Sequence, residues 1–207
     1  MRRTALVLAL SLSFAAAHAA EQVRPAPAFS AIRVQGPISV TVEAGKAQSI
    51  TVRGSDRFLA GLTSEVVDGE LRLGMRDKHL SVGKGEQRVV VTLPALRAFK
   101  AEGAGETILN NIRGDRFDAS YRGAGRMVIN GQVKFFKMRA EGVGEVDTKG
   151  LIANEADVRF QGIGDVKVYA KDKLETVVQG MGTLTYYGKP RSINNSVNGI
   201  GSVDAGD

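Results

Sequence analysis

Apolar and polar residues alternate along most of this chain, and short glycine-containing turns separate the alternating runs. Since successive side chains of a β-strand point to opposite faces, a period of two predicts strands that each bury one face. The first of these strands are predicted from the apolar positions that follow Phe29: Ile32, Val34, Ile38, Val40, Val42, Ile50 and Val52. The chain is therefore expected to be a β protein from its first periodic segment onward.

Local signals interrupt or join the predicted strands. The alternation breaks at 56–62, which predicts a short helical turn capped by Ser55 or Asp56. The segment 66–73 predicts a hairpin, because Asp68-Gly69 is a strong signal for a tight turn between two strands. The run 79–86 is mostly polar and predicts a loop, and 89–93 predicts one further strand.

Six Gly-x-Gly triplets then follow, and successive triplets are 20, 19, 20, 18 and 19 residues apart. Their glycines are Gly103, Gly105, Gly123, Gly125, Gly142, Gly144, Gly162, Gly164, Gly180, Gly182, Gly199 and Gly201. Positions at strand period on both sides of each triplet are mostly apolar, with polar residues between them. A unit of this size cannot bury its apolar face alone, so the repeat predicts an all-β solenoid with about 19–20 residues per coil.

The glycines have two competing interpretations. Glycine adopts positive φ without Cβ strain and lets backbones approach closely, so a glycine in every coil suits a corner or a bulge. A dinucleotide-binding loop would need three glycines between a strand and a helix. Each triplet lies in strand-like sequence with no amphipathic helix after it, and we therefore reject the nucleotide interpretation.

The residue between the two glycines is apolar in every triplet: Ala104, Ala124, Val143, Ile163, Met181 and Ile200. If the glycines form a corner, these side chains turn inward and fill the core, which is the interpretation that we favour. If the strand passes straight through, they share the outward direction of the neighbouring charged residues and form an exposed apolar stripe. Such a stripe would suggest a surface for a partner or a ligand.

Two columns of polar residues flank the triplets. The residues before them are Glu102, Arg122, Glu141, Gln161, Gln179 and Asn198, and those after them are Glu106, Arg126, Glu145, Asp165, Thr183 and Ser202. In an in-register stack, neighbouring coils bring these side chains into contact, so acid, base and acid alternate over the first three coils. We predict two salt-bridge ladders, of which the first continues as a ladder of amides.

One step of the second column stacks like charges, because Glu145 meets Asp165, and Asp147 lies two residues further along the coil of Glu145. Adjacent carboxylates need a cation, a raised pKa or a basic neighbour. Glu145, Asp147 and Asp165 are therefore candidate binding residues, either for a hard cation such as Ca²⁺ or in charge sharing with Arg126 and Lys167. We assign no metal site, because hard cations take about six to eight oxygen ligands.

The first 20 residues predict a secretory signal peptide, with Arg2 and Arg3 before an apolar run and a small-x-small cleavage site at Ala17-His18-Ala19. We divide the rest into a flexible leader at 21–28 and a single domain at 29–207. The domain comprises N-terminal strands at 29–95 and glycine coils at 96–207. No later apolar stretch is long enough to span a membrane. We expect a protein of the periplasm, or one that is secreted or held at the cell surface.

Composition argues against several classes of function. The chain has no cysteine, so neither disulfides nor a lipid anchor on cysteine is expected. Without Arg2 and Arg3 it has 26 basic and 22 acidic residues, a mild excess with no basic cluster, so we expect no nucleic-acid partner. His79 is the one histidine after the signal, which leaves nucleophilic triads and zinc sites without support. We expect a non-enzymatic protein without a cofactor.

The order of these features resembles the head GIN domain of putative autotransporter adhesins, a family of exported bacterial proteins. The resemblance covers about 29–203 and rests on four segments: Phe29-Ser30-Ala31-Ile32-Arg33-Val34, Val40-Thr41-Val42, Asp68-Gly69-Glu70-Leu71 with Leu73, and the Gly-x-Gly coils. It implies a right-handed parallel β-helix, or solenoid, in the cell envelope. The family supplies no catalytic or binding residues to transfer.

We predict an adhesion-type module of the cell envelope whose flat face contacts a glycan or a protein. Because the chain ends at Asp207, soon after the sixth triplet, we expect a free module rather than the head of a full autotransporter. One alternative is a polysaccharide-active β-helix enzyme, which would need converging acids in a groove. The other is a structural homo-oligomer of the envelope, because the last coil has no evident capping element and its open edge could pair with another chain.

Overall fold

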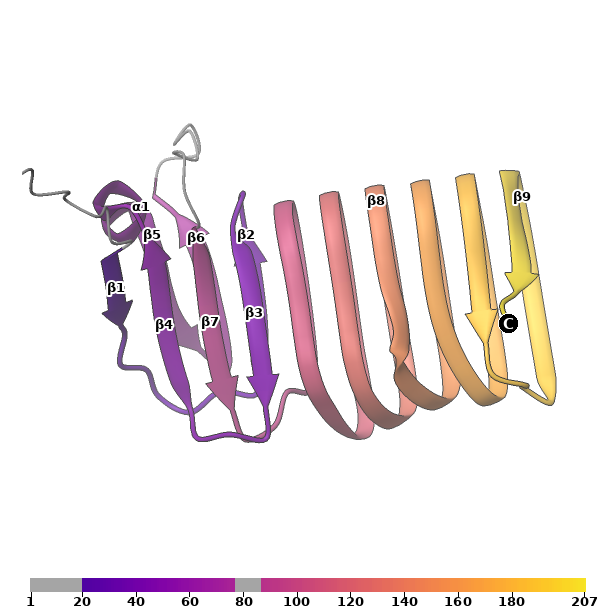
Figure 1. Ribbon diagram of the computed structural model, residues 1–207, viewed down its shortest axis with the longest axis horizontal. Helices are drawn as coiled ribbons and strands as arrows, with labels where there is room; N and C mark the ends of the chain where they lie inside the picture. Colours follow the sequence, from indigo (N-terminus) through magenta and orange to yellow (C-terminus); the bar gives the residue numbers. More distant parts are fainter. Residues whose placement is uncertain (1–19, 77–86) are drawn as a thin grey trace, which may run out of the picture.

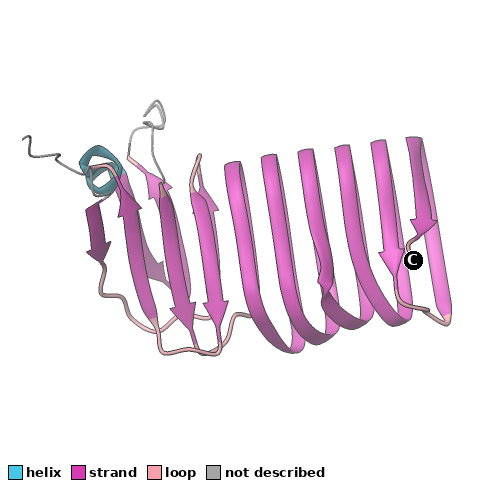
Figure 2. Ribbon diagram, viewed as in Figure 1, coloured by secondary structure: helices cyan, strands magenta, loops and turns pink. Residues whose placement is uncertain are grey.

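The computed structural model describes residues 20–76 and 87–207, and these residues form an all-β fold with one short helix (Figure 2). The predicted signal peptide lies outside the described residues up to residue 19, and so does the loop with His79. The elements are β1 Ala20–Val23, β2 Ala31–Gln35, β3 Ser39–Ala44, β4 Ser49–Gly54, α1 Asp56–Gly61, β5 Leu62–Val67, β6 Glu70–Met75, β7 Arg88–Leu93, β8 Ala98–Tyr187 and β9 Ser192–Ala205. The all-β class is confirmed.

The strands form one open sheet of mixed direction, in the order β1-β4-β7-β3-β8-β2-β6-β5, with β9 added to β8. Pairs are parallel where β2 and β3 meet β8, and where β8 meets β9. They are antiparallel at the N-terminal end, where β1 pairs with β4, β4 with β7 and β5 with β6. A uniform stack of coils would be parallel throughout, whereas this sheet contains both parallel and antiparallel pairs.

β8 continues over 90 residues and winds through successive layers that stand side by side along the molecule (Figure 1). Each layer has two walls. The first wall precedes the triplet and continues β2, whose residues 31–35 pair with 98–102. The second wall follows the triplet and continues β3, whose residues 40–43 pair with 107–110. The turn between β2 and β3 at Gly36-Pro37-Ile38 is therefore the first layer of the triplet column.

The core lies between the two walls and follows the predicted alternation. Buried side chains from successive layers stack on one another, and the rings of Phe117 and Phe136 lie parallel with their centroids 6.2 Å apart. Two threonines inside the core are hydrogen-bonded: the Thr148 hydroxyl donates to the Lys167 carbonyl oxygen at 2.7 Å, and the Thr176 hydroxyl donates to Oδ1 of Asn195 at 2.9 Å. One continuous core thus runs the length of the stack.

The N-terminal end of the core is closed by local structure that the sequence predicted. Helix α1 begins after Ser55, whose hydroxyl accepts a bond from the Phe58 amide, and the Phe58 ring is buried. The hairpin turn forms at Asp68 and Gly69, with φ of 51° and 74°. These positive angles are those of a tight turn whose twist matches its strands.

The prediction of a flexible leader at 21–28 is wrong for the first of these residues. Residues 20–23 form β1 on the antiparallel edge of β4, because their backbone completes the ladder that β4 leaves open. The guanidinium of Arg24 then donates to the carbonyl oxygens of Leu59 and Leu62 at 2.6 and 2.7 Å. The segment is held to the helix that closes the core.

The glycines allow the layers to approach at the triplets. Gly144 has a φ of 146°, and a Cβ at that position would collide with the carbonyl oxygen of Gly125 in the layer before it. A side chain would therefore be strained by its backbone angle and would also separate the layers. The backbone interpretation of the triplets is confirmed.

Candidate functional site

The middle residues of the triplets form an exposed apolar ridge, which we define as Val143, Ile163, Met181 and Ile200 together with Ala104 and Ala124. The exposed fractions of the four larger side chains are 54%, 48%, 48% and 80%. The inward orientation that we favoured is wrong. The alternative, an exposed stripe, is what the structure shows.

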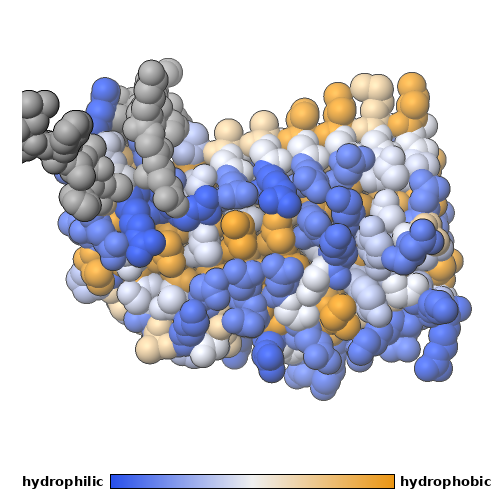
Figure 3. Space-filling view, in the orientation of Figure 1, coloured by the Kyte–Doolittle hydropathy of each residue, from blue (hydrophilic) through white to orange (hydrophobic). Residues whose placement is uncertain are grey.

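The ridge forms because the backbone turns at each triplet while the side chain of the middle residue still points to solvent. The buried residues on either side, such as Phe160 and Val166, point inward as they would if the strand continued straight through the triplet. The glycine between each of them and the middle residue bends the backbone at positive φ. The chain thus turns from one wall to the other while the middle side chain stays outside. Figure 3 shows the result as a row of protruding apolar residues along the upper edge, over β8 and β9.

The second-wall column beside the ridge is a continuous ion-pair ladder. Glu106 binds Arg88 at 2.8 Å and Arg126 at 3.6 Å, and Arg126 also binds Glu145 at 3.3 Å. Glu145 in turn binds Lys167 at 3.1 Å. Hydrogen bonds from Arg88 and Lys167 are the main reasons that the pKa values of Glu106 and Glu145 lie below their ordinary value. The predicted ladder is confirmed in this column.

The first-wall column is less regular than predicted. Arg122 binds Glu141 at 2.8 Å, as expected for neighbouring layers. Glu102 instead binds Lys100 of its own strand at 2.6 Å, and this bond lowers the pKa of Glu102. Amides do form a ladder, but on the second wall away from the triplets, where Asn130 donates to Asn110 and Asn110 to Glu43.

The three candidate acids lie close to the ridge but do not form one cluster. Glu145 is compensated by Arg126 and Lys167, which is the charge-sharing alternative of the two that we considered. Asp147 accepts a bond from the Lys149 amide at 3.2 Å, and Asp165 is exposed. Within residues 20–76 and 87–207, no group of three such side chains is placed to hold a metal ion.

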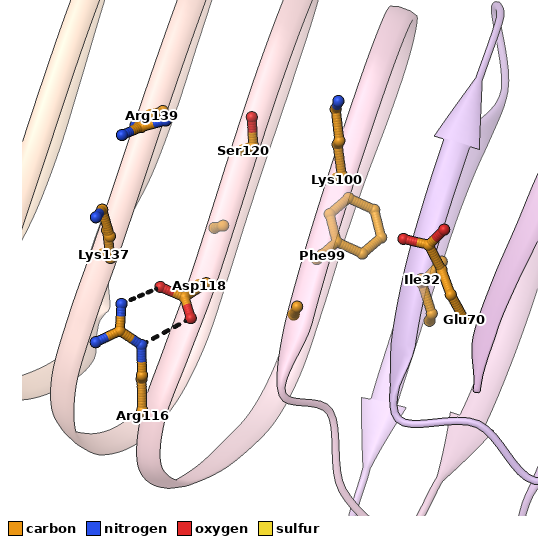
Figure 4. Close-up of a pocket in the computed structure, with 11 residues that line it drawn as sticks. Ile32, Glu70, Phe99, Lys100, Arg116, Asp118, Ser120, Lys137 and Arg139 are labelled. Carbon is orange, nitrogen blue, oxygen red and sulfur yellow. Dashed lines mark hydrogen bonds and ion pairs between the residues drawn. The ribbon is translucent and has the colours of Figure 1, made fainter. Parts of the chain in front are cut away.

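A second candidate site lies on the first wall, in a shallow depression of about 400 Å³ (Figure 4). Lys100, Ser120 and Arg139 line it from three successive layers, and Lys137 lies beside Arg139. Arg116 also lines it but is neutralised by Asp118, with two bonds of 2.8 Å. Neither Lys137 nor Arg139 has an ion-pair partner among the described residues, so the depression carries uncompensated positive charge.

Sequence reasoning missed this depression because its residues come from positions that are not adjacent in the chain. Lys137 and Arg139 are two residues apart in the chain, but they lie near Lys100 and Ser120 only through the stacking of layers. Strand period places Lys100, Ser120 and Arg139 on the outward face. It does not indicate that their layers leave a depression, or that Lys137 lines it beside them.

Together, the fold and the ridge define an elongated all-β protein whose exposed features repeat from layer to layer. A family model described as putative auto-transporter adhesin, head GIN domain, matches residues 28–190. The match covers most of the chain, and the chain belongs to this family. Among curated proteins, none matches it.

Several solved structures share the fold. A putative adhesin from Bacteroides fragilis NCTC 9343 is 21% identical, with 92% of this chain and 98% of that chain covered and a TM-score of 0.72. A putative adhesin from Parabacteroides distasonis ATCC 8503 is 16% identical, with 90% and 96% covered and a TM-score of 0.55. A putative lipid binding protein from the same organism is also 16% identical, with 92% and 98% covered and a TM-score of 0.53. At these identities the likeness concerns the fold.

The described residues contain no helix that is both long and apolar enough to cross a membrane.

Proposed function

We propose that this protein is a non-enzymatic, exported module of the cell envelope that adheres to a protein partner through its apolar ridge. The observation that carries the proposal is the exposure of Val143, Ile163, Met181 and Ile200 in consecutive layers. Large aliphatic side chains are normally buried, and a contiguous exposed set is a mark of an interaction surface. Membership of an adhesin-like family supports the same class of function.

The geometry of the ridge favours a protein over a glycan as its occupant. The ridge is convex and aliphatic, and neighbouring side chains are about 4.8 Å apart, as adjacent strands are. Such a row fits an apolar groove, whereas sugars are usually bound by aromatic faces and hydrogen bonds. The ladders on both sides form a charged rim, in which we place Glu145 and Asp165, with Asp147 further down the second wall.

We further propose that the layers of β8 and β9 form a right-handed parallel β-solenoid. The in-register pairing of 173–186 with 192–205 and the close approach of successive triplets support a coil per repeat. The proposal of export rests on the family and on the expected signal peptide, and leaves the periplasm and the cell surface as the two locations.

A capture experiment tests the ridge. The wild-type chain is immobilised and exposed to an envelope extract, beside a ridge variant with Val143→Ser, Ile163→Ser and Met181→Ser. A control variant has Lys149→Ser, Lys171→Ser and Lys189→Ser, which are equally outward but off the ridge. We expect a partner that the wild type and the control capture and the ridge variant does not. Equal capture by all three, with equal melting temperatures, would contradict the proposal.

The depression on the first wall supports a second candidate function, the binding of an anionic glycan. Lys137 and Arg139 present free positive charge beside the Ser120 hydroxyl, which suits a carboxylate, sulfate or phosphate group on a sugar. A glycan array compares the wild type with Lys137→Gln plus Arg139→Gln. Binding of acidic glycans that the double variant loses would support this function, and binding that ignores both substitutions would exclude it.

A further inference from the structure

The C-terminal end of the stack presents an unpaired strand edge. β9 runs from Ser192 to Ala205 and bonds to β8 along one side, while its other side has no partner strand among the described residues. Residues 192–201 are all exposed. Val197 lies directly over the buried Val178, and Val203 over the buried Leu184, so both cover the end of the core. The edge and the apolar end of the core are open at the same place.

β9 lacks the features that normally protect an exposed edge. Edge strands usually carry charges, proline or bulges that prevent pairing with another chain. Between Ser192 and Ala205 the single ionisable side chain is Asp204, and proline is absent. The preceding layer, 173–186, carries Lys173 and Glu175 at its start. The open edge is thus more neutral than the layer that it covers.

The sequence of β9 is arranged symmetrically about Ile200. Val197 and Val203 lie three residues before and after Ile200, and both face the core end. The first wall runs toward the ridge and the second wall runs away from it. A two-fold axis that passes through the ridge therefore pairs the first wall of one copy with the second wall of another, in antiparallel direction.

We propose that two copies of this chain join through β9 about such a two-fold axis, in the register that places Ile200 opposite the partner's Ile200. In this register Val197 lies opposite the partner's Val203, so the two core ends cover each other. Asp204 lies opposite the partner's Ser196, and no like charges meet. The two apolar ridges become continuous across the interface.

The other end of the molecule favours a closed pair over an endless filament. A filament would need β9 of one copy to pair with the N-terminal end of the next. That end is closed by α1, with Phe58 buried against the core, and its outer strands are antiparallel. The partner that fits the open end is therefore the same end of a second copy.

A cysteine cross-link tests the register, because the chain has no cysteine of its own. Directly opposed antiparallel residues have Cα atoms about 4.5–5.5 Å apart, which lies within the range of a disulfide. We expect Ile200→Cys to form a covalent dimer under mild oxidation. Two controls should form no covalent dimer: Met181→Cys, on the same ridge one layer further in, and Ser196→Cys, on the same strand but off the axis. Equal cross-linking of Ile200→Cys and Met181→Cys would overturn the proposal, and so would equal cross-linking of Ser196→Cys.

Sedimentation of the unmodified protein gives an independent readout. We expect a dimer whose dissociation constant rises by more than about tenfold in Val197→Lys, because the substitution places charge at the apolar end of the core. Val143→Ser should leave the dimer unchanged, although it weakens the ridge. A wild-type protein that stays monomeric at its highest soluble concentration would refute the dimer and leave the ridge proposal standing.

Discussion

The two ends of the stack solve the same physical problem differently. A core built between two walls is apolar at both ends, and each end must be covered. At the N-terminal end the chain turns back on itself in antiparallel strands and places α1 over the core (Figure 1). At the C-terminal end β9 simply adds one more layer and stops, with Val197 40% exposed.

The repeating sequence pattern therefore determines how each internal layer packs, but it does not determine how the two ends of the core are covered. Every internal layer is held by its neighbours on both sides, whereas a terminal layer needs either a different local structure or a partner. The N-terminal end is closed by α1 and antiparallel strands, which do not follow the pattern of the layers and leave no place for a further layer. The C-terminal layer keeps the pattern of the internal layers, which leaves it able to accept another layer.

The largest loss of stability is expected from a substitution at the closed, N-terminal end. Phe58→Ala removes the buried ring of α1 and should lower the free energy of unfolding by about 3–5 kcal/mol. Urea unfolding followed by circular dichroism measures the change. A loss below about 1 kcal/mol would mean that the helix does not close the core.

A smaller loss is expected where β1 is held to the cap. Arg24→Met removes the donor to the carbonyl oxygens of Leu59 and Leu62 and should cost about 1–3 kcal/mol, because those partly buried groups are left unsatisfied. The control is Arg191→Ala, whose side chain is 87% exposed. If both variants unfold at the same urea concentration, the anchoring of the N-terminal strand is not a source of stability.

The ladder between the two ends should respond to acid. The pKa of Glu145 is lowered by the hydrogen bond from Lys167, so its stabilising contribution is present above the unfolded pKa of about 4.3 and is lost as pH falls through the lower folded value. Because the pair is partly exposed, Glu145→Gln should cost no more than about 1 kcal/mol at pH 7. Thermal melts between pH 7 and pH 3 should show the two proteins converging as the pH falls. A constant difference across that range would contradict the ladder.

The smallest effect is expected at the open end. Ile200→Ser, measured at a concentration too low for association, should change the free energy of unfolding by less than about 0.5 kcal/mol, since the side chain is 80% exposed. At high concentration the same substitution should lower the melting temperature, because it weakens the proposed dimer. A large loss at low concentration would show that Ile200 is part of the core of a single chain.

Much of the fold could be predicted from local patterns. The alternation at Ile32 and Val34, the cap at Ser55 and the Asp68-Gly69 turn each depend on a few neighbouring residues, and each is found as predicted. The antiparallel β1 could not be predicted, because its partner β4 lies about thirty residues away and Glu21 and Gln22 carry no strand signal. Of the candidate site, the ladder at Glu106, Arg126 and Glu145 was predictable from the spacing of the triplets.

The sequence by itself determined that the chain forms strands, that a unit of about twenty residues repeats, and which family it belongs to. The tertiary structure decided that the residues between the glycines face solvent, that Lys137 and Arg139 meet Ser120 in one depression, and that one end is closed and the other open. The physical reason is that the alternation of apolar and polar residues and the spacing of the glycines can be read along the chain itself. The direction of a side chain at a turn depends on backbone angles that the stacked layers determine, such as the φ of 146° at Gly144.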